Sequence, residues 1–270
     1  MNKSFPIGIF DSGVGGLSVL KKIQSKLPNE SLVYVADSIH APYGPKNDSF
    51  ILGRSITIVD FLLAKHQIKL LVIACNTATA SSISKLREIY DFPIIGMEPA
   101  IKPANDASKN KKVGILATEG TINSSKFSAL LDSYSGETHF FTQPCVGLVE
   151  HIERGEVDSI EVISLLHKNL IPLLEHNVDV IVLGCTHYIF IRKIVENFFS
   201  NKITIIETGD AVALQVQRKL KEFNFESGML DMKHIIYSNS KCSKMNLVIN
   251  SLLECYDFTY DFHSNWDESL

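Results

Sequence analysis

Two cysteines stand directly after apolar segments that have the composition of buried strands. Cys75 ends the run "LVIAC", and Cys185 ends the run "VIVLGC" about 110 residues later. A single cysteine in such a place is often a small packing residue. Two in matching places indicate chemistry. Both are followed by polar side chains, which are Asn76 and Thr77 after the first and Thr186 and His187 after the second.

A thiol becomes reactive where its thiolate is favoured by backbone N–H groups at a helix start or by a nearby base. Cys75 precedes a helical stretch, and His187 lies two residues after Cys185 as a plausible proton partner. Zinc is the rival interpretation of these three side chains. No Cys-x-x-Cys or paired histidines supply a fourth ligand, so we expect no metal site.

Two thiols, one from each half of a chain, suit one reaction class in particular. A hydrolase needs a single nucleophile with its base, and a redox pair usually lies close together in sequence. Inverting a stereocentre requires a proton to be removed from one face of a carbon and another to be delivered to the opposite face. Two equivalent acid/base groups across a cleft meet that requirement.

The segment "GIFDSGVGGLS" places a glycine-rich turn after another apolar run. Gly13, Gly15 and Gly16 predict a tight turn whose free N–H groups at a helix start suit a carboxylate or phosphate. A simple turn with Asp11 or Ser12 as the helix cap is the alternative. The spacing matches neither the Walker loop nor the dinucleotide fingerprint.

The segment "ADSIHAPYGPK" contains Asp37, His40, Tyr43 and Gly44. Two prolines around the Tyr-Gly pair predict a rigid loop, in which the tyrosine could cover a ligand and donate its hydroxyl. An ordinary surface loop is the alternative interpretation.

Short runs rich in valine and isoleucine alternate with helical patterns, which predicts an α/β protein with mainly parallel sheets. The expected strands are 6–10, 31–36, 69–74, 93–97, 112–117, 138–142, 179–184 and 203–207. The first four correspond to the last four in order, at offsets between about 106 and 111 residues. We pair Gly8 with Gly114, Val33 with Phe140, Cys75 with Cys185, and Ile95 with Ile206.

This repeat predicts two similar α/β domains related by pseudo-twofold symmetry, with the active site in the cleft between them. The tail holds a helix pattern over 211–223, a strand over 234–238 and a helix from about 243 to 255. A third domain of about 60 residues would be small, so we expect the tail to complete the first half. The predicted domains are 1–98 with 209–270, and 99–208. Residues 263–270 are expected to form a polar, frayed end.

The overall composition limits the classes of binding partner that we expect. The chain has 270 residues and a net charge of −4, without the basic stripe of a nucleic-acid binder. No apolar run approaches the ~20 residues that span a bilayer, and the start lacks the features of a secretion signal. We therefore expect a cytoplasmic protein with a small-molecule substrate, neither nucleic acid nor membrane as partner, and free thiols at all five cysteines.

Four motifs, "GIFDSGVGG", "APYG", "ACNTATA" and "GCTHY", resemble those of the glutamate racemases in the cofactor-independent aspartate/glutamate racemase superfamily. The likeness covers nearly the whole chain. It implies that Cys75 and Cys185 are acid/base thiols assisted by Asp11 and His187, respectively. It also implies a substrate-binding set, which is Asp11, Ser12, Tyr43, Gly44, Asn76, Thr77, Thr186 and His187, with Thr118 and Thr121 as weaker candidates.

The resemblance implies an acidic residue near the second thiol, for which Glu153 is the best match and Glu150, one helical turn earlier, the alternative. Ile189 and Val146 stand where family members commonly have proline. A third thiol, Cys145, is expected to pack near the cleft, and Cys242 and Cys255 carry no motif. The family's product feeds peptidoglycan synthesis, and homodimers are common among such enzymes, although the sequence contains no interface signature.

The hypothesis is interconversion of L- and D-glutamate by two-base proton transfer, with neither metal nor pyridoxal phosphate required. Hydroxyls of Ser12, Thr77 and Thr186 could bind the carboxylates and stabilise developing charge. An aspartate or hydantoin racemase of the same superfamily is the nearest alternative. A non-catalytic amino-acid-binding protein and a thiol redox sensor are alternatives from other classes.

Overall fold

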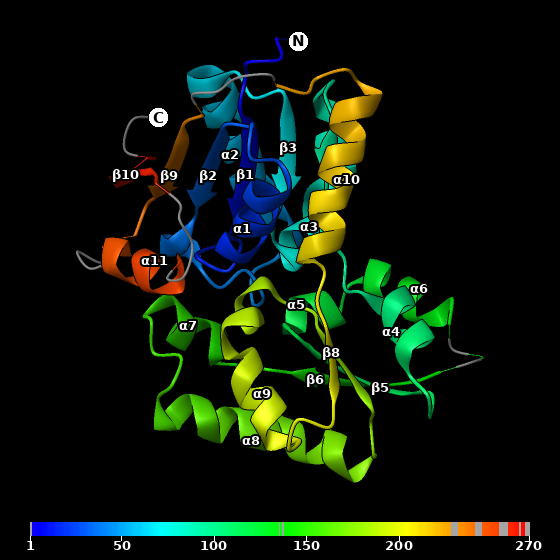
Figure 1. Cartoon of the computed structure of the whole chain (residues 1–270). Helices are drawn as coiled ribbons and strands as arrows, with labels where there is room; N and C mark the ends of the chain where they lie inside the picture. Colours follow the sequence, from blue (N-terminus) through cyan, green and yellow to red (C-terminus); the bar gives the residue numbers. More distant parts are fainter. Residues whose placement is uncertain are drawn as a thin grey trace.

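The computed structural model describes residues 2–134, 136, 138–227, 232–240, 245–253, 259–264 and 266–267. Its strands form two sheets, one in each half of the molecule, and every paired strand is parallel to its neighbour (Figure 1). The prediction of an α/β fold with two parallel sheets is confirmed. No helix in these residues is both long and apolar enough to cross a membrane.

The first sheet has the order β10-β9-β2-β1-β3-β4. Its strands are β1 (Ile7–Asp11), β2 (Leu32–Ala36), β3 (Leu70–Ile73), β4 (Ile94–Ile95), β9 (His234–Ser238) and β10 (Asp261–Ser264). The second sheet has the order β6-β5-β7-β8. Its strands are β5 (Lys112–Ala117), β6 (His139–Pro144), β7 (Val180–Leu183) and β8 (Thr204–Ile206). Each of the eight strands of the repeat lies where the sequence predicts one.

The repeat extends to the register of the strands. Gly8 pairs with Leu71 in the first sheet as Gly114 pairs with Ile181 in the second. The pairing of Val33 with Phe140 is wrong by one residue, because Gly8 lies opposite Val33 whereas Gly114 lies opposite Phe141. The two halves therefore share strand order and register, and the offset at this strand is one residue larger than the sequence alignment indicates.

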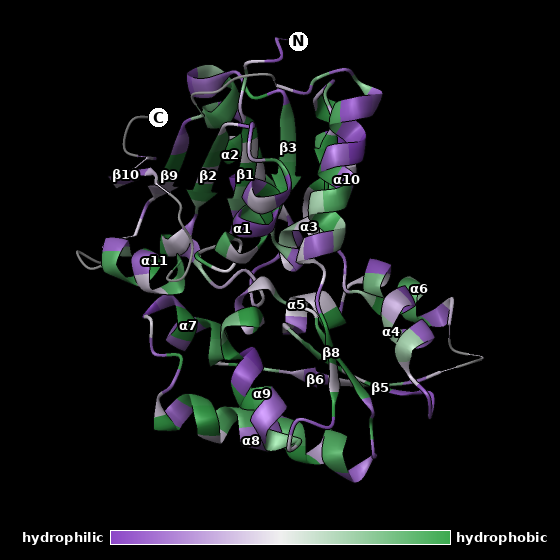
Figure 2. Cartoon of the chain, viewed as in Figure 1, coloured by the Kyte–Doolittle hydropathy of each residue, from purple (hydrophilic) through white to green (hydrophobic). Residues whose placement is uncertain are grey.

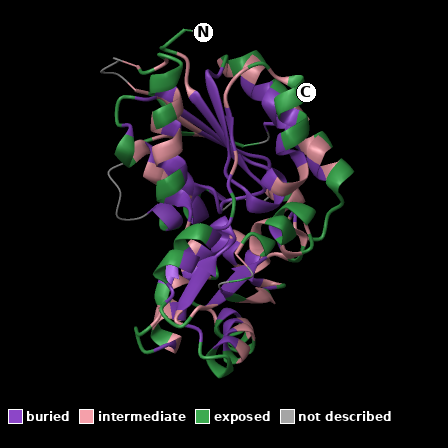
Figure 3. Ribbon diagram, turned by 90° about the vertical axis from the view of Figure 1, so that its right-hand side faces the viewer, coloured by how far each residue is buried: buried purple, intermediate pink, exposed green. Residues whose placement is uncertain are grey.

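Helices cover both faces of the first sheet because alternate residues of its buried strands point to opposite sides. Ile7 and Ile9 pack in the same apolar cluster as residues of α1 (Leu17–Lys26) and α10 (Gly209–Glu222). Phe10 packs in the cluster that contains residues of α2 (Asp48–His66) and α3 (Asn76–Ile89). The inner strands are hydrophobic (Figure 2) and buried at the centre of each half (Figure 3), whereas the edge strands β6 and β10 are partly exposed and the helices carry most of the exposed surface.

The helices are α1 (Leu17–Lys26), α2 (Asp48–His66), α3 (Asn76–Ile89), α4 (Ile101–Ala107), α5 (Glu119–Ile122), α6 (Ser125–Asp132), α7 (Leu148–Glu153), α8 (Ile160–Glu175), α9 (Arg192–Phe198), α10 (Gly209–Glu222) and α11 (Met245–Leu253). Two 3-10 helices, η1 (Ser38–His40) and η2 (Thr186–Ile191), follow β2 and β7. The tail returns to the first half, since α10 packs on α1 and β9 pairs with β2.

The prediction of a frayed end is wrong for the described residues from His263 onward. His263 and Ser264 lie in β10, which pairs with β9. Trp266 is 2% exposed, packs on Phe61 at 5.2 Å between ring centroids, and donates its indole N–H to the Ala36 carbonyl at 3.3 Å. The remaining positions of that segment, and the outer ends of the helix expected over 243–255, lie outside the described residues.

Replacing Trp266 with alanine should destabilise the protein, because the change opens a cavity beside Phe61 and removes the indole hydrogen bond. We expect a loss of about 3–5 kcal/mol and a melting temperature lower by roughly 10 °C, measured by calorimetry. Phe223→Ala is the control, since Phe223 is 45% exposed and such surface changes cost about 0.5 kcal/mol or less. Equal melting temperatures for the two variants would contradict the assignment of Trp266 to the core.

Candidate active site

The two cysteines of the motifs occupy equivalent places in the two halves. Cys75 follows β3 and caps α3, where its sulfur accepts the Ala78 amide N–H at 3.4 Å. Cys185 follows β7 and precedes η2. Both side chains are buried, with 5% and 8% of their surface exposed. Each thiol therefore stands at the carboxyl end of an inner strand, where α/β sheets bind ligands.

Asp11 joins the two halves between these thiols. Its Oδ1 accepts from the Ser12 hydroxyl at 3.0 Å, and that hydroxyl lies 3.8 Å from the Cys75 sulfur. Its Oδ2 accepts from the Thr186 hydroxyl at 3.0 Å, and Thr186 is the neighbour of Cys185 in the chain. A fully buried carboxylate is thus shared by the carboxyl edges of both sheets.

A series of polar side chains in contact with one another leads from Cys185 to Glu153. The Cys185 sulfur lies 3.8 Å from His187 Nδ1, and His187 Nε2 lies 2.6 Å from Glu153 Oε1. The same oxygen accepts the Val14 amide N–H at 2.7 Å. Glu153 therefore stands beside the imidazole, whereas Glu150 lines a separate pocket with Cys145 and Gly147.

The glycine turn packs closely against Glu153 and His187. A Cβ on Gly13 would lie 1.8 Å from Glu153 Oε1, and one on Gly15 would lie 2.2 Å from His187 Nδ1. Neither glycine has a positive φ, so close approach explains why these positions lack a side chain. The prediction of free N–H groups for an anion needs correction at Val14, because the protein's own Glu153 carboxylate accepts that amide.

Burial and charge place the two thiols in different surroundings. Burial raises the pKa of the Cys75 thiol, and the nearby Asp11 carboxylate adds to the rise. Burial also raises the pKa of Asp11 itself. Burial opposes the charged form of His187, yet its contacts with Cys185 and Glu153 raise its pKa well above 6.5. The imidazole therefore favours its protonated form beside Cys185, and Cys75 favours the neutral thiol.

Threonines make a second bridge between the halves. The Thr77 hydroxyl, at the start of α3, lies 2.9 Å from that of Thr118 and 3.3 Å from that of Thr121. Asn76 donates to the Met97 carbonyl at 3.4 Å, and its Oδ1 is buried without a hydrogen-bond partner among the described residues. These four side chains lie at the same junction of the two halves.

The Tyr43 hydroxyl has a different partner from the one the sequence suggests. It donates to Asp37 at 2.6 Å, and the side chain is 1% exposed. The hydroxyl is therefore not available to a ligand in this structure. Gly44 packs against Thr118 of the second half, since a Cβ on Gly44 would come within 3.1 Å of the Thr118 Cβ.

Cys145 is a buried, unpaired thiol whose sulfur lies 3.6 Å from the Gln143 carbonyl. It lines the pocket that lies between the Gly44 loop and residues of the second half, including Thr118 and Glu150. Cys75 and Cys185 are also unpaired. Cys242 and Cys255, expected to be free, lie outside the described residues.

Tyr34, which no sequence motif indicated, supports the glycine turn. Tyr34 is fully buried in β2, and its hydroxyl donates to the Gly13 carbonyl at 2.6 Å. A tyrosine in a strand that is otherwise apolar needs a partner for its hydroxyl. The need for a hydrogen-bond partner could have marked Tyr34 in the sequence, although it does not identify which residue the partner is.

Comparison with known proteins matches the Asp/Glu/Hydantoin racemase family model to residues 7–216, more than half of the chain. A glutamate racemase of Pseudomonas paraeruginosa is 50% identical over 219 residues, covering 81% of this chain and 82% of the relative. One of Ectopseudomonas mendocina is 46% identical over 255 residues, covering 94% and 97%. The chain belongs to the Asp/Glu/hydantoin racemase family.

Solved racemase structures agree with the fold. Glutamate racemase of Escherichia coli, in complex with L-glutamate and the activator UDP-MurNAc-ala, has a TM-score of 0.85 at 30% identity and covers 97% of this chain and 98% of its own. Glutamate racemase of Francisella tularensis, in complex with D-glutamate, has a TM-score of 0.83 at 27% identity and covers 98% and 99%.

In this racemase, Gly15→Ala should reduce activity sharply, because the added Cβ would displace His187 from its contacts with Cys185 and Glu153. We expect kcat/KM to fall about 100-fold, since a misplacement of about 1 Å costs that much. Gly53→Ala is the control, because a Cβ there meets nothing within 4 Å and alanine favours a helix. Activity of Gly15→Ala close to that of Gly53→Ala would contradict the packing argument.

Glu153→Gln should lower the pKa of His187, because it removes the negative charge that stabilises the imidazolium. The histidine would then lose its proton at a lower pH than in the unmodified protein. Nitrogen-15 NMR of the His187 ring across pH 5 to 9 measures the change. Glu150→Gln, one helical turn earlier, is the matched control and should leave the titration unchanged. A larger shift in the control would reverse the assignment of the two glutamates.

Proposed function

We propose that this racemase interconverts L- and D-glutamate by proton transfer between Cys75 and Cys185, with no bound cofactor. The observation that carries the proposal is the Asp11 bridge, which ties the surroundings of the two thiols together at the junction of the sheets. Family membership and the glutamate racemases similar to this chain support the same substrate.

The reaction requires one thiolate and one thiol at the start. The thiolate takes the proton from the glutamate Cα, and the opposite thiol then donates its proton to the other face of the same carbon. The C–H bond that breaks and the one that forms lie on opposite sides, so the configuration inverts. The protonation states of the two sulfurs are then exchanged, and the reverse reaction starts from the exchanged state.

A separate acid/base side chain lies near each of the two sulfurs. Asp11 lies one hydroxyl away from Cys75 through Ser12. His187 lies beside Cys185, and Glu153 orients its ring from the far side. We propose that these side chains accept or return protons as the sulfurs change state, since a base held by a third group is the usual arrangement around an activated thiol.

The substrate carboxylates and ammonium need fixed partners because the carbanionic transition state is high in energy. We propose that hydroxyl and backbone groups of the junction turn from one another to the substrate on binding. The buried Asn76 Oδ1 is an acceptor suited to the ammonium. The proposed contact residues are Asp11, Ser12, Tyr43, Gly44, Asn76, Thr77, Thr118, Thr121, Thr186 and His187.

Both thiols are buried, so we propose that glutamate enters when the two halves move apart. The proposed domains are residues 1–98 with 209–270, and residues 99–208. The tail's pairing with the first sheet supports this division. We place the reaction in the cytoplasm, where thiols remain reduced, and its D-glutamate product in peptidoglycan synthesis. A homodimer stays a prediction.

Cys75→Ser and Cys185→Ser should each abolish racemisation, because a serine hydroxyl is too weak an acid and base to replace the thiol. Solvent exchange of the Cα proton should persist from one enantiomer only, a different one for each variant. Circular dichroism follows racemisation, and proton NMR in deuterium oxide follows exchange.

Cys145→Ser is the control and should retain racemisation, because a serine hydroxyl can make the same contact with the Gln143 carbonyl. Racemisation at the unmodified rate in both site variants would rule out the two-thiol mechanism. The same assay with aspartate separates the proposed substrate from the alternative one, since faster turnover of aspartate would overturn the choice of glutamate.

A further inference from the structure

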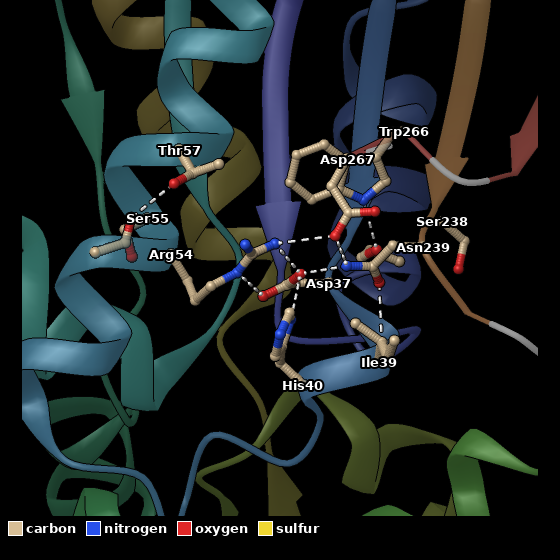
Figure 4. A network of polar contacts seen from close by, with 12 residues as sticks. Asp37, Ile39, His40, Arg54, Ser55, Thr57, Ser238, Asn239, Trp266 and Asp267 are labelled. Atoms are coloured by element: carbon tan, nitrogen blue, oxygen red, sulfur yellow. Dashed lines mark hydrogen bonds and ion pairs between the residues drawn. The ribbon is translucent and has the colours of Figure 1, made fainter. Parts of the chain in front are cut away.

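Asp37 is a fully buried carboxylate that the proposed mechanism does not use. It follows β2, and its backbone N–H donates to the Asp11 carbonyl at 3.1 Å. Arg54 binds it through two N–H groups, Nε to Oδ2 at 3.0 Å and Nη2 to Oδ1 at 2.7 Å. Asn239 donates to Oδ1 at 2.6 Å, and His40 Nδ1 lies 3.0 Å from the same oxygen (Figure 4).

Residues near the carboxyl end of the chain brace this cluster. Asp267 Oδ2 accepts from Asn239 Nδ2 at 2.9 Å and lies 3.5 Å from Arg54 Nη2. The Arg54 guanidinium also lies over the Trp266 ring, 5.5 Å from its centroid. Side chains from three parts of the sequence thus fix the position of one carboxylate (Figure 4).

The remaining contact of Asp37 leads to the active site. Its Oδ2 accepts the Tyr43 hydroxyl at 2.6 Å. Burial, and then the Asp37 charge, raise the pKa of Tyr43 well above 10, so the phenol keeps its proton and remains a donor. Gly44, the next residue, packs against Thr118 and Gly120 of the second half, where a Cβ on Gly120 would lie 2.6 Å from the Gly44 carbonyl oxygen.

We propose that Asp37 is a positioning residue for racemisation, acting through the Tyr43 hydroxyl to hold Gly44 against the second half. Arg54 and Asn239 hold Asp37, and Asp267 holds both of them. The inference rests on the proposed function, because Tyr43 and Gly44 belong to the proposed substrate contacts. It also changes the role of Tyr43. The Tyr43 hydroxyl binds Asp37, and the backbone of the turn makes the contact with the substrate.

Tyr43→Phe tests this inference because it removes only the oxygen that Asp37 holds. A turn that contacts substrate in the ground state and the transition state alike affects KM more than kcat. We expect KM for glutamate to rise about tenfold, the effect of losing one hydrogen bond to a charged group, while kcat falls less than threefold. A purely structural bond would lower the melting temperature and leave KM unchanged.

Tyr90→Phe is the matched control. The Tyr90 hydroxyl donates to Asp60 at 2.7 Å, also in the first half, and this bond lies on an exposed surface. We expect this variant to keep both kcat and KM. Asp37→Asn is the second variant, to be used if Tyr43→Phe fails to fold. It weakens the hold of Arg54 while keeping an acceptor for Tyr43, so its KM should rise about threefold.

Amide hydrogen exchange supplies a readout that does not depend on turnover. The Lys46 amide donates to the Tyr43 carbonyl at 2.9 Å and reports whether the turn is closed. Its exchange should be at least tenfold faster in Tyr43→Phe and unchanged in Tyr90→Phe. An unchanged KM or an unchanged exchange rate in Tyr43→Phe would overturn the inference. Failure of the proposed function looks different, because the unmodified enzyme would then leave the optical rotation of glutamate constant.

Discussion

A single buried carboxylate, that of Asp11, is the constraint on which the arrangement of both halves depends. Its two oxygens accept one hydrogen bond from Ser12 of the first half and one from Thr186 of the second. A buried carboxylate without such donors is strongly disfavoured, and hydrogen bonds to a charged group contribute about 1.5–3 kcal/mol each. In this arrangement of the halves both oxygens of Asp11 are hydrogen-bonded, and in the opening that we propose for substrate entry water would take the place of Thr186. Closure and the surroundings of both thiols are coupled through this group.

The sequence predicts most of the fold because parallel strands buried on both faces leave continuous valine and isoleucine runs. That signal marks the strands from β1 to β9 except β6, which contains no valine or isoleucine and was predicted from Phe140 and Phe141. It fails for β10, since Asp261–Ser264 is a polar edge strand with mostly exposed residues, and its place is decided by pairing with β9. The pairing of Val33 with Phe140 instead of Phe141 has a similar origin, because register depends on contacts between strands and the apolar run of β6 does not specify it.

The candidate site is readable in the sequence wherever its residues lie at or just after the carboxyl end of a strand, as Asp11, Cys75 and Cys185 do. Glu153 and Glu150 are harder to separate, since they lie one turn apart on α7. The structure brings Glu153 to His187 and the Val14 amide, a contact that joins residues 139 positions apart. The Asp37 cluster was beyond prediction for the same reason, because Asn239 reaches Asp37 over 202 positions. Local motifs identify the chemistry, and long-range contacts determine its geometry.

The burial of both thiols has a consequence for the durability of the enzyme. Oxidation of cysteine to sulfenic acid requires a thiolate that peroxide can reach. Cys75 and Cys185 are buried in this structure, so an oxidant would reach them only during the opening that we propose for substrate entry. Oxidation of the two cysteines should therefore increase with the frequency of opening. An enzyme molecule that is not turning over substrate is protected by the burial of its thiols.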